Sequence, residues 1–185
     1  MRRRLSAINA IASCASEIST SSSIYLGPVT LRHTVGNHNR QGFDCNRPEL
    51  NDWLAKIARR HQENGLSKTF VAVPDDAPKR ILGCYALSLT EVETQALPDA
   101  LRSRLPRVVS GVRLGRLAVD QSAQGRQLGE LLLVDAMPRV RAIREHAGVI
   151  GLFIDAVDEE AKGFYIRYGA VVFIDSPLKL LLPVP

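Results

Sequence analysis

The residues most able to bind a ligand lie in a glycine-containing segment, Gln124–Glu130, which follows the apolar run Leu117–Val119. Gly125 and Gly129 precede an apolar periodic pattern, so the sequence predicts a strand, a loop and then a helix. The loop amides and the positive end of such a helix point at one place, where a phosphate group is stabilised. The pattern therefore indicates a pyrophosphate site, although glycine is also common at strand-to-helix turns for steric reasons alone.

A second segment places two aromatic residues, Phe164 and Tyr165, next to each other in a short helical pattern that ends at Tyr168-Gly169. Gly169 suits the left-handed residue that follows a helix. Because one turn takes about 3.6 residues, the two rings are expected on different faces of the helix. Taken alone, such a pair is explained at least as well by core packing.

Together the two segments resemble the GCN5-related N-acetyltransferase (GNAT) family. The resemblance rests on a strand ending Arg-Leu-Ala-Val-Asp (116–120), the loop Gln-Gly-x-x-Leu-Gly (124–129) and the helix Ala-x-x-Phe-Tyr-x-x-Tyr-Gly (161–169). More narrowly, the chain resembles the toxins of type II toxin–antitoxin pairs that acetylate aminoacyl-tRNA. This likeness spans about residues 39–184 and includes Phe43-Asp44-Cys45, Lys68–Ala72, Arg113–Asp120 and Ser176–Leu182.

The resemblance implies an acetyl-coenzyme A site and no metal ion. Leu117 and Val119 would pair with the pantetheine arm as an added strand does, and the amides from Gln124 to Gly129 would hold the pyrophosphate. Tyr165 would be the catalytic residue that protonates the departing thiolate, because tyrosine at about pKa 10 and a thiol at about 8.5 are close enough. The expected cofactor-binding residues are Leu117, Ala118, Val119, Gln124, Gly125, Arg126, Gln127, Leu128, Gly129, Glu130 and Phe164.

One residue departs from the family pattern, which has glycine where this chain has Gln127. A side chain there either projects outward without effect or blocks the backbone's approach to phosphate, an approach that glycine permits. Gly125 lies at a different register and does not replace the missing glycine. Because of this departure, the sequence does not decide whether the chain binds acetyl-CoA tightly.

The nucleophile has to be an uncharged amine, and no general base stands out among the four histidines. An α-amine, with a reference pKa of about 7.7–8.0, is partly neutral at pH 7, whereas a lysine at about 10.4 is almost fully protonated. This fits the α-amino group of aminoacyl-tRNA, the substrate that the resemblance implies, together with a ribbon–helix–helix antitoxin and a homodimer. Two other hypotheses stay open: acetylation of a small-molecule or protein amine, and a catalytically weak coenzyme A-binding module.

The net charge of +5 favours an anionic partner. The arginines Arg59 and Arg60, on the polar side of an expected helix, form the strongest candidate pair for tRNA phosphates. Basic side chains occur on the surface of any soluble domain, so a merely solvated face is the alternative. The expected tRNA contacts are Arg59, Arg60, Arg113, Arg116 and Arg167, with Lys68 and Arg126 as further candidates.

The elements that must position these residues alternate between strand and helix patterns. Strands are expected over residues 29–31, 68–73, 81–89, 111–119, 149–156, 171–174 and 178–182, and helices over 47–65, 98–105, 129–144 and 159–168. Pro138 is expected to kink the third helix. The order predicts a mixed α/β (α+β) protein with the GNAT fold, a mostly antiparallel central sheet with helices on both faces.

The length of 185 residues suits one domain, which is expected over residues 26–185. Residues 1–25 are expected to be a disordered extension or to result from a start codon placed too far upstream. Three widely spaced cysteines make neither a disulfide framework nor a zinc site, which favours a reducing cytoplasm. No apolar run reaches the roughly 18–20 residues that cross a bilayer, so no membrane partner is expected.

Overall fold

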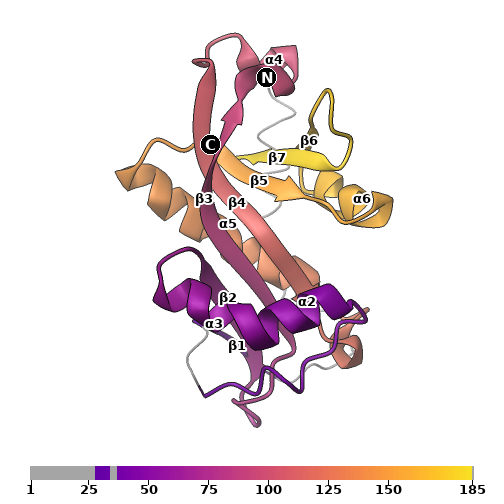
Figure 1. Ribbon diagram of the computed structural model, residues 1–185. Helices are drawn as coiled ribbons and strands as arrows, with labels where there is room; N and C mark the ends of the chain where they lie inside the picture. Colours follow the sequence, from indigo (N-terminus) through magenta and orange to yellow (C-terminus); the bar gives the residue numbers. More distant parts are fainter. Residues whose placement is uncertain (1–27, 34–36, 185) are drawn as a thin grey trace. The chain divides into compact units, whose positions relative to one another are not determined.

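The computed structural model describes residues 28–33 and 37–184, and the expected extension over residues 1–25 lies outside this part. The strands form a seven-stranded sheet in the order β1-β2-β3-β4-β5-β7-β6 (Figure 1). They are β1 (Val29–His33), β2 (Lys68–Pro74), β3 (Gly83–Glu93), β4 (Val108–Val119), β5 (Gly151–Asp155), β6 (Val171–Val172) and β7 (Lys179–Pro183). The helices are α2 (Pro48–Asp52), η1 (Trp53–Ile57), α3 (Ala58–Glu63), η2 (Thr94–Ala96), α4 (Asp99–Arg102), η3 (Gln121–Ala123), α5 (Leu128–His146) and α6 (Glu159–Arg167).

Antiparallel pairing dominates the sheet. β1 pairs with β2, β2 with β3, β5 with β7 and β6 with β7, all antiparallel. The turn after Pro74 joins β2 to β3, as the cluster of proline and aspartate residues there predicts. The mixed α/β fold with a mostly antiparallel sheet is therefore confirmed.

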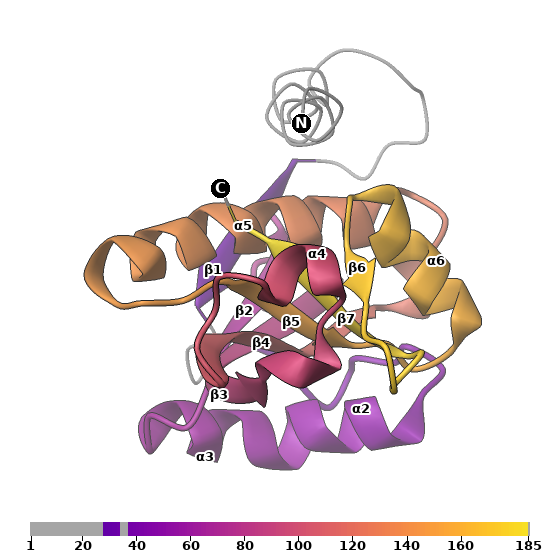
Figure 2. The ribbon, with the colours of Figure 1, turned by 90° about the horizontal axis from the view of Figure 1, so that it is seen from above.

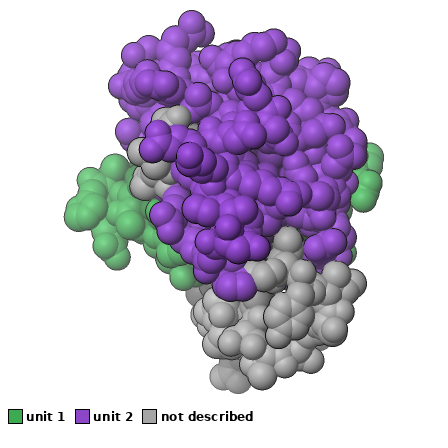
Figure 3. Space-filling model, turned by 90° about the horizontal axis from the view of Figure 1, so that it is seen from below, with its two compact units in different colours: residues 1–22, 89–113, 137–185 green, residues 23–88, 114–136 purple. Residues whose placement is uncertain are grey.

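The chain divides into two compact units, drawn in green and purple in Figure 3. Of the described residues, unit 1 holds 89–113 and 137–184, and unit 2 holds 28–33, 37–88 and 114–136. The predicted phosphate loop belongs to unit 2, and the aromatic pair Phe164-Tyr165 belongs to unit 1. The single domain expected over residues 26–185 stays a prediction.

Unit 2 has helices on both faces of its strands (Figure 2). On one face, Trp53 and Leu54 of η1 share a buried cluster with Ala86 of β3. Tyr85 points to the opposite face, because successive strand residues alternate, and its hydroxyl donates a hydrogen bond to Asp135 of α5. One face of these strands thus packs against η1, and the other face holds α5, the helix that follows the phosphate loop.

The helix expected over residues 47–65 forms, but its middle is not an α-helix. Residues Trp53–Ile57 wind as a π-helix, and the Ala58 N–H donates to the Trp53 carbonyl five residues earlier. The wider turn buries both Trp53 and Leu54 and brings the Trp53 ring 6.5 Å from His61 in an edge-to-face contact. Single π turns occur frequently at functional sites, and residue periodicity does not reveal them.

Unit 1 has its own core, in which Leu97, Val109 and Phe173 surround Phe153 of β5. The rings of Phe153 and Phe173 meet edge to face with centroids 5.9 Å apart. Gly111 of β4 is required by this packing, since a Cβ there would lie 2.3 Å from the Phe153 ring. This core supports β5, the strand that precedes α6.

The structure corrects the extent of several elements. The expected strands over 149–156 and 171–174 shorten to Gly151–Asp155 and Val171–Val172. The buried Val149, Ala156 and Phe173 lie just beyond these strands, so their apolar character reflects core packing. The expected helix over 98–105 shortens to Asp99–Arg102, whereas α5 runs through the exposed Pro138 to His146. Within the described residues, no helix is long and apolar enough to cross a membrane, and no group of His, Cys, Asp and Glu side chains suits a metal ion.

Candidate active site

The predicted phosphate loop forms in unit 2, where residues 124–127 join η3 to α5 and all four residues are exposed. The Leu131 N–H donates to the Gln127 carbonyl at 3.1 Å, which is where the hydrogen-bonded ladder of α5 begins. The amides before it have no place in the ladder and can bind an anion at the positive end of the helix dipole. These amides belong to Leu128, Gly129 and Glu130.

Two loop residues adopt the left-handed backbone conformation, Gly125 with φ of 71° and Gln127 with φ of 60°. Glycine adopts this conformation freely, but a residue with a side chain is strained by about 1–2 kcal/mol. Gln127 therefore stands where the backbone turns in the glycine conformation. Its side chain is exposed, which supports the outward projection and not the blocked loop.

Gly129 lies in the first turn of α5, and packing within the protein does not require a glycine there. A Cβ at this position would lie 3.8 Å from Cγ2 of Val119, an ordinary van der Waals contact. Any need for glycine at this position has to come from a ligand above the helix end. This open surface suits a group that approaches the backbone closely.

The strand segment expected to hold pantetheine already makes one side-chain contact. Gln124 Nε2 donates to the Val119 carbonyl at 3.0 Å and, more weakly, to the Cys45 carbonyl at 3.4 Å. A carbonyl has two lone pairs, so Val119 can accept a second hydrogen bond. Gln124 thus ties the end of β4 to the loop that follows it, a role that the sequence does not reveal.

Asp44 fastens the chain before α2 to the turn after β4. Its carboxylate accepts hydrogen bonds from the Asn46 N–H at 2.9 Å, the Asn51 side chain at 2.8 Å and the Gln121 side chain at 2.9 Å. The Asn46 amide and, after it, the Asn51 side chain lower the pKa of Asp44. The Asp44 N–H in turn donates to the carboxylate of Asp120 at 3.0 Å. In the sequence, only the Asp-Cys-Asn triplet (44–46), which is typical of an Asx turn, indicates that Asp44 has this structural role.

Tyr165 lies in α6 of unit 1 and is 7% exposed. Local interactions set the helix around it, because the Asp158 carboxylate caps the Ala161 N–H at 2.8 Å and Gly169, with φ of 89°, ends the helix. Burial raises the pKa of the Tyr165 hydroxyl above its ordinary value of about 10. Among the described residues the hydroxyl has no hydrogen-bond partner, so its proton is available to a ligand.

Phe164 lies on a more open face of α6 than Tyr165, as the helical spacing predicts. Its ring is 5.0 Å from the ring of Tyr165 and 5.1 Å from that of Tyr168. The guanidinium of Arg167 lies 5.8 Å from the centre of the Phe164 ring. Phe164 therefore packs between both tyrosines and holds the side chain of Tyr165 in place.

The five candidate tRNA arginines are exposed, but the structure divides them between the units. In unit 2, Arg59 pairs with Glu63 at 2.6 Å, whereas Arg60 has no ion-pair partner among the described residues. Arg116 lies 5.4 Å from the centre of the Trp53 ring. The unit 1 candidates are Arg113, which pairs with Asp155 at 3.3 Å, and Arg167.

Cysteine chemistry does not compete with Tyr165 in the described part of the chain. Cys45 and Cys84 are buried and free. Burial raises the pKa of Cys45 and raises the pKa of Cys84 to about 12, so neither is a thiolate at neutral pH. Since the thiolate is the nucleophilic form, a covalent acetyl-cysteine route through these residues is disfavoured.

Comparison with known proteins identifies the chain. It is 34% identical over 140 residues to the tRNA-acetylating toxin of Mycobacterium tuberculosis (strain ATCC 25618 / H37Rv), a match that covers 76% of this chain and 82% of that protein. The chain belongs to the family of tRNA-acetylating toxins. It is an acetyl-CoA-dependent acetyltransferase with the GNAT fold. No protein-family model matches it.

Solved structures of this toxin family agree with the fold. A tyrosine-to-phenylalanine mutant of KacT has a TM-score of 0.80 at 30% identity and covers 84% of this chain and 95% of its own. AtaT in complex with acetyl-methionyl-tRNAfMet has a TM-score of 0.79 at 28% identity, with 84% and 95% covered. The AtaTR complex with acetyl-CoA has a TM-score of 0.72 at 26% identity, with 84% and 93% covered.

Proposed function

We propose that this toxin transfers acetyl from acetyl-CoA to the α-amino group of an aminoacyl-tRNA and thereby removes that tRNA from translation. The observation that carries the proposal is the exposed loop of residues 124–127, which leads into the free amides at the start of α5. The relatives add the chemistry, because AtaT is known with acetyl-methionyl-tRNAfMet and AtaTR with acetyl-CoA.

In this proposal the pyrophosphate is held by the amides from Gln124 to Gly129, and pantetheine follows Leu117 and Val119 as an added strand would. Acetyl-CoA supplies the acetyl group as a thioester. Gln127 is no obstacle, because its side chain is exposed. This exposure counts against the weak coenzyme A-binding module as the alternative.

Tyr165 is the general acid of the transfer. A nitrogen–carbon bond forms at the acetyl carbonyl while the carbon–sulfur bond breaks, and the hydroxyl gives its proton to the sulfur. The phenolate then recovers a proton from the acetylated amine, which has one in excess. Because burial raises the pKa of Tyr165, the hydroxyl stays protonated throughout the neutral pH range. The same burial makes it a weaker acid than a free tyrosine, so its proton moves to the sulfur only as negative charge develops there.

The acceptor needs no strong base on the enzyme. An α-amine with a pKa of about 7.7–8.0 is already partly neutral near pH 7, unlike the side chain of lysine. The exposed arginines, Arg60 above all, supply phosphate contacts that a small amine would not use. These two features favour aminoacyl-tRNA over a protein lysine or a small amine.

The partners and setting follow from the same proposal. The relative AtaT has been solved with its antitoxin AtaR, and KacTA with DNA. We infer an antitoxin of the ribbon–helix–helix type for this chain, a homodimer as its free form and the cytoplasm as its site of action, where charged tRNA is present.

One experiment tests the function directly. The purified chain is incubated with acetyl-CoA and total aminoacylated tRNA, and nuclease digests are searched by mass spectrometry for N-acetyl-aminoacyl-adenosine. We expect that product for a limited set of amino acids. Acetylation of free amines or of protein lysines in place of the aminoacyl ester would overturn the proposal.

Tyr165→Phe tests the mechanism. The ring and its packing remain while the proton donor is lost, so turnover should fall about 10²–10⁴-fold, the usual worth of general-acid catalysis, with acetyl-CoA affinity by calorimetry preserved. Tyr168→Phe is the matched control, because Tyr168 packs on Phe164 at the helix end and its variant should keep most activity. If only Tyr168→Phe loses activity, the assignment of the acid is wrong by one helical turn.

A further inference from the structure

A pocket of about 270 Å³ opens in unit 1 over β3, β4, β5 and β7. Sites that enclose a whole drug-sized ligand are larger, about 300–1,000 Å³. The pocket therefore lies at the small end of ligand sites and can take a group the size of one amino acid.

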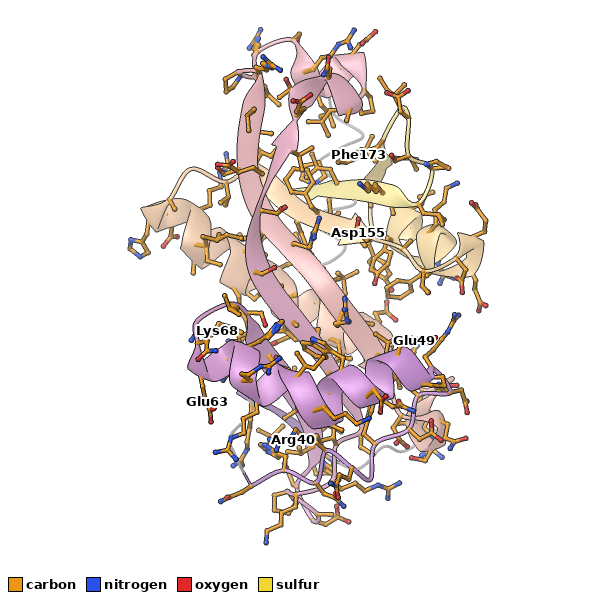
Figure 4. All side chains as sticks on the ribbon, viewed as in Figure 1. Arg40, Glu49, Glu63, Lys68, Asp155 and Phe173 are labelled. Carbon is orange, nitrogen blue, oxygen red and sulfur yellow. The ribbon has the colours of Figure 1, made fainter. Side chains whose placement is uncertain are left out.

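The floor of the pocket, its most buried part, is apolar. Phe153 and Phe173 line it, and both are less than a tenth exposed and packed edge to face. Figure 4 labels Phe173 and Asp155, which both contribute to its lining. Phe153 and Asp155 share one face of β5 because they are two residues apart. An apolar floor and a charged wall thus adjoin on the same strand.

The charged wall is centred on the carboxylate of Asp155. Arg113 of β4 pairs with it at 3.3 Å, and Lys179 of β7 is its direct cross-strand neighbour. The side chains of Arg113 and Asp155 are 47% and 48% exposed, so the pair is open to a ligand. Two cations beside one carboxylate offset its charge without removing its capacity to accept hydrogen bonds.

The other charges of the pocket are negative. Glu91 and Glu93 of β3 also line it, which makes three carboxylates against the two cations Arg113 and Lys179. Arg107, which is not part of the lining, approaches Glu93 at 3.6 Å with its side chain 84% exposed. A phosphate in the pocket would face these carboxylates, whereas an ammonium group or amine would be attracted to them.

We propose that this pocket binds the aminoacyl group of the acceptor, with the α-amine donating to Asp155 and the amino-acid side chain against Phe153 and Phe173. The proposal rests on the proposed function and names the part of the substrate that unit 1 recognises. The cations Arg113 and Lys179 keep the carboxylate from holding the amine wholly in its protonated, unreactive form. Only three residues separate Asp155 from α6, which carries Tyr165.

Arg113 acquires a different function in this proposal. From the sequence it is a candidate phosphate contact, but its guanidinium is engaged with Asp155 inside a pocket with more negative than positive groups. It is a positioning residue that orients the carboxylate towards the amine.

The first test compares Asp155→Asn with Asp175→Asn. Asp175 is an exposed carboxylate of the loop before β7 and is not part of the pocket lining. We expect Asp155→Asn to raise KM for aminoacyl-tRNA by about 10–100-fold, the range for a lost hydrogen bond to a charged group, with acetyl-CoA affinity and thermal midpoint nearly unchanged. Asp175→Asn should behave as wild type in all three measurements.

A binding measurement separates this proposal from the proposed function. NMR titration with leucine methyl ester should shift resonances of the pocket in the wild type and in Asp175→Asn, but much less in Asp155→Asn. The α-hydroxy analogue of this ester, which lacks the amine, should bind the wild type only weakly. If the wild type acetylates no aminoacyl-tRNA but the ester still binds through Asp155, the proposed function fails and amine recognition by the pocket stands.

A second variant tests the pocket's volume. Thr90 lines it from β3, and Thr90→Ile adds bulk while keeping a β-branched side chain that suits the strand. We expect relative kcat/KM to shift at least fivefold towards aminoacyl-tRNAs with small side chains.

Three results would overturn the inference while leaving the acetylation of aminoacyl-tRNA intact. They are an unchanged KM and ester binding in Asp155→Asn, an unchanged amino-acid preference in Thr90→Ile, and a loss of deacylated tRNA binding in Asp155→Asn as large as the loss for aminoacyl-tRNA. The last result would assign the pocket to the tRNA body.

Discussion

Gln127→Gly should make this protein more stable, although glycine usually destabilises a fold. Gln127 has φ of 60° at the position where the GNAT sequence pattern leads one to expect glycine, and its side chain is exposed. The substitution therefore removes backbone strain and leaves a surface position. Since the backbone already follows the glycine conformation, the amides of the loop should keep their places.

The magnitude follows from two opposing effects. Relief of the left-handed strain is worth about 1–2 kcal/mol, and the extra freedom of glycine in the unfolded chain costs about 0.4–1 kcal/mol. The difference is a gain of about 1 kcal/mol in the free energy of unfolding. For a protein of this length that corresponds to a rise of about 2–4 °C in Tm.

Arg126→Gly is the matched control. Arg126 is the exposed neighbour of Gln127, and it is not among the described residues with positive φ. Glycine there brings only the unfolded-state cost, so Tm should fall by about 1–3 °C. Both variants are measured by thermal unfolding and by urea titration.

Calorimetry with acetyl-CoA completes the test, and Gln127→Gly should bind it as tightly as the wild type or more tightly. If Gln127→Gly lowers Tm as much as Arg126→Gly does, the backbone at Gln127 is not strained. Substantially weaker acetyl-CoA binding would make the Gln127 side chain a ligand in its own right.

Two further predictions concern charge and pH. Arg60→Ala should weaken tRNA binding more than Arg59→Ala, because Arg59 is engaged with Glu63. The Arg60→Ala variant should also lower the slope of log K against log salt by about 0.7–0.9 per lost phosphate contact. Equal slopes in salt titrations of both variants would show that Arg60 is only a solvated surface residue. The acetylation rate should rise with pH through about 7.7–8.0 as the α-amine loses its proton, then stay level to at least about pH 10 because burial raises the pKa of Tyr165. Initial rates that decline between pH 8 and 9 in a stopped assay would contradict the buried acid.

Local patterns in the sequence determined much of this protein. Alternation and helical spacing predict the strands and helices in their order, and the residues that cap α6, Asp158 and Gly169, lie within the segment that forms it. The loop of residues 124–127 and the placement of Tyr165 on a helix follow from such short-range rules. These features are predictable because their energies depend on residues within a few positions of each other.

Other features were decided only by tertiary structure. Arg113 meets Asp155, and Asp155 lies opposite Lys179, only because distant strands pair in one register, so an expected phosphate contact became part of a pocket. The left-handed turn at Gln127 also escapes the sequence, because residue type argues against it. Periodicity tells which face of a strand a residue occupies, but not which residue of another strand lies beside it, and that neighbour sets the charge, the burial and the chemistry of a site.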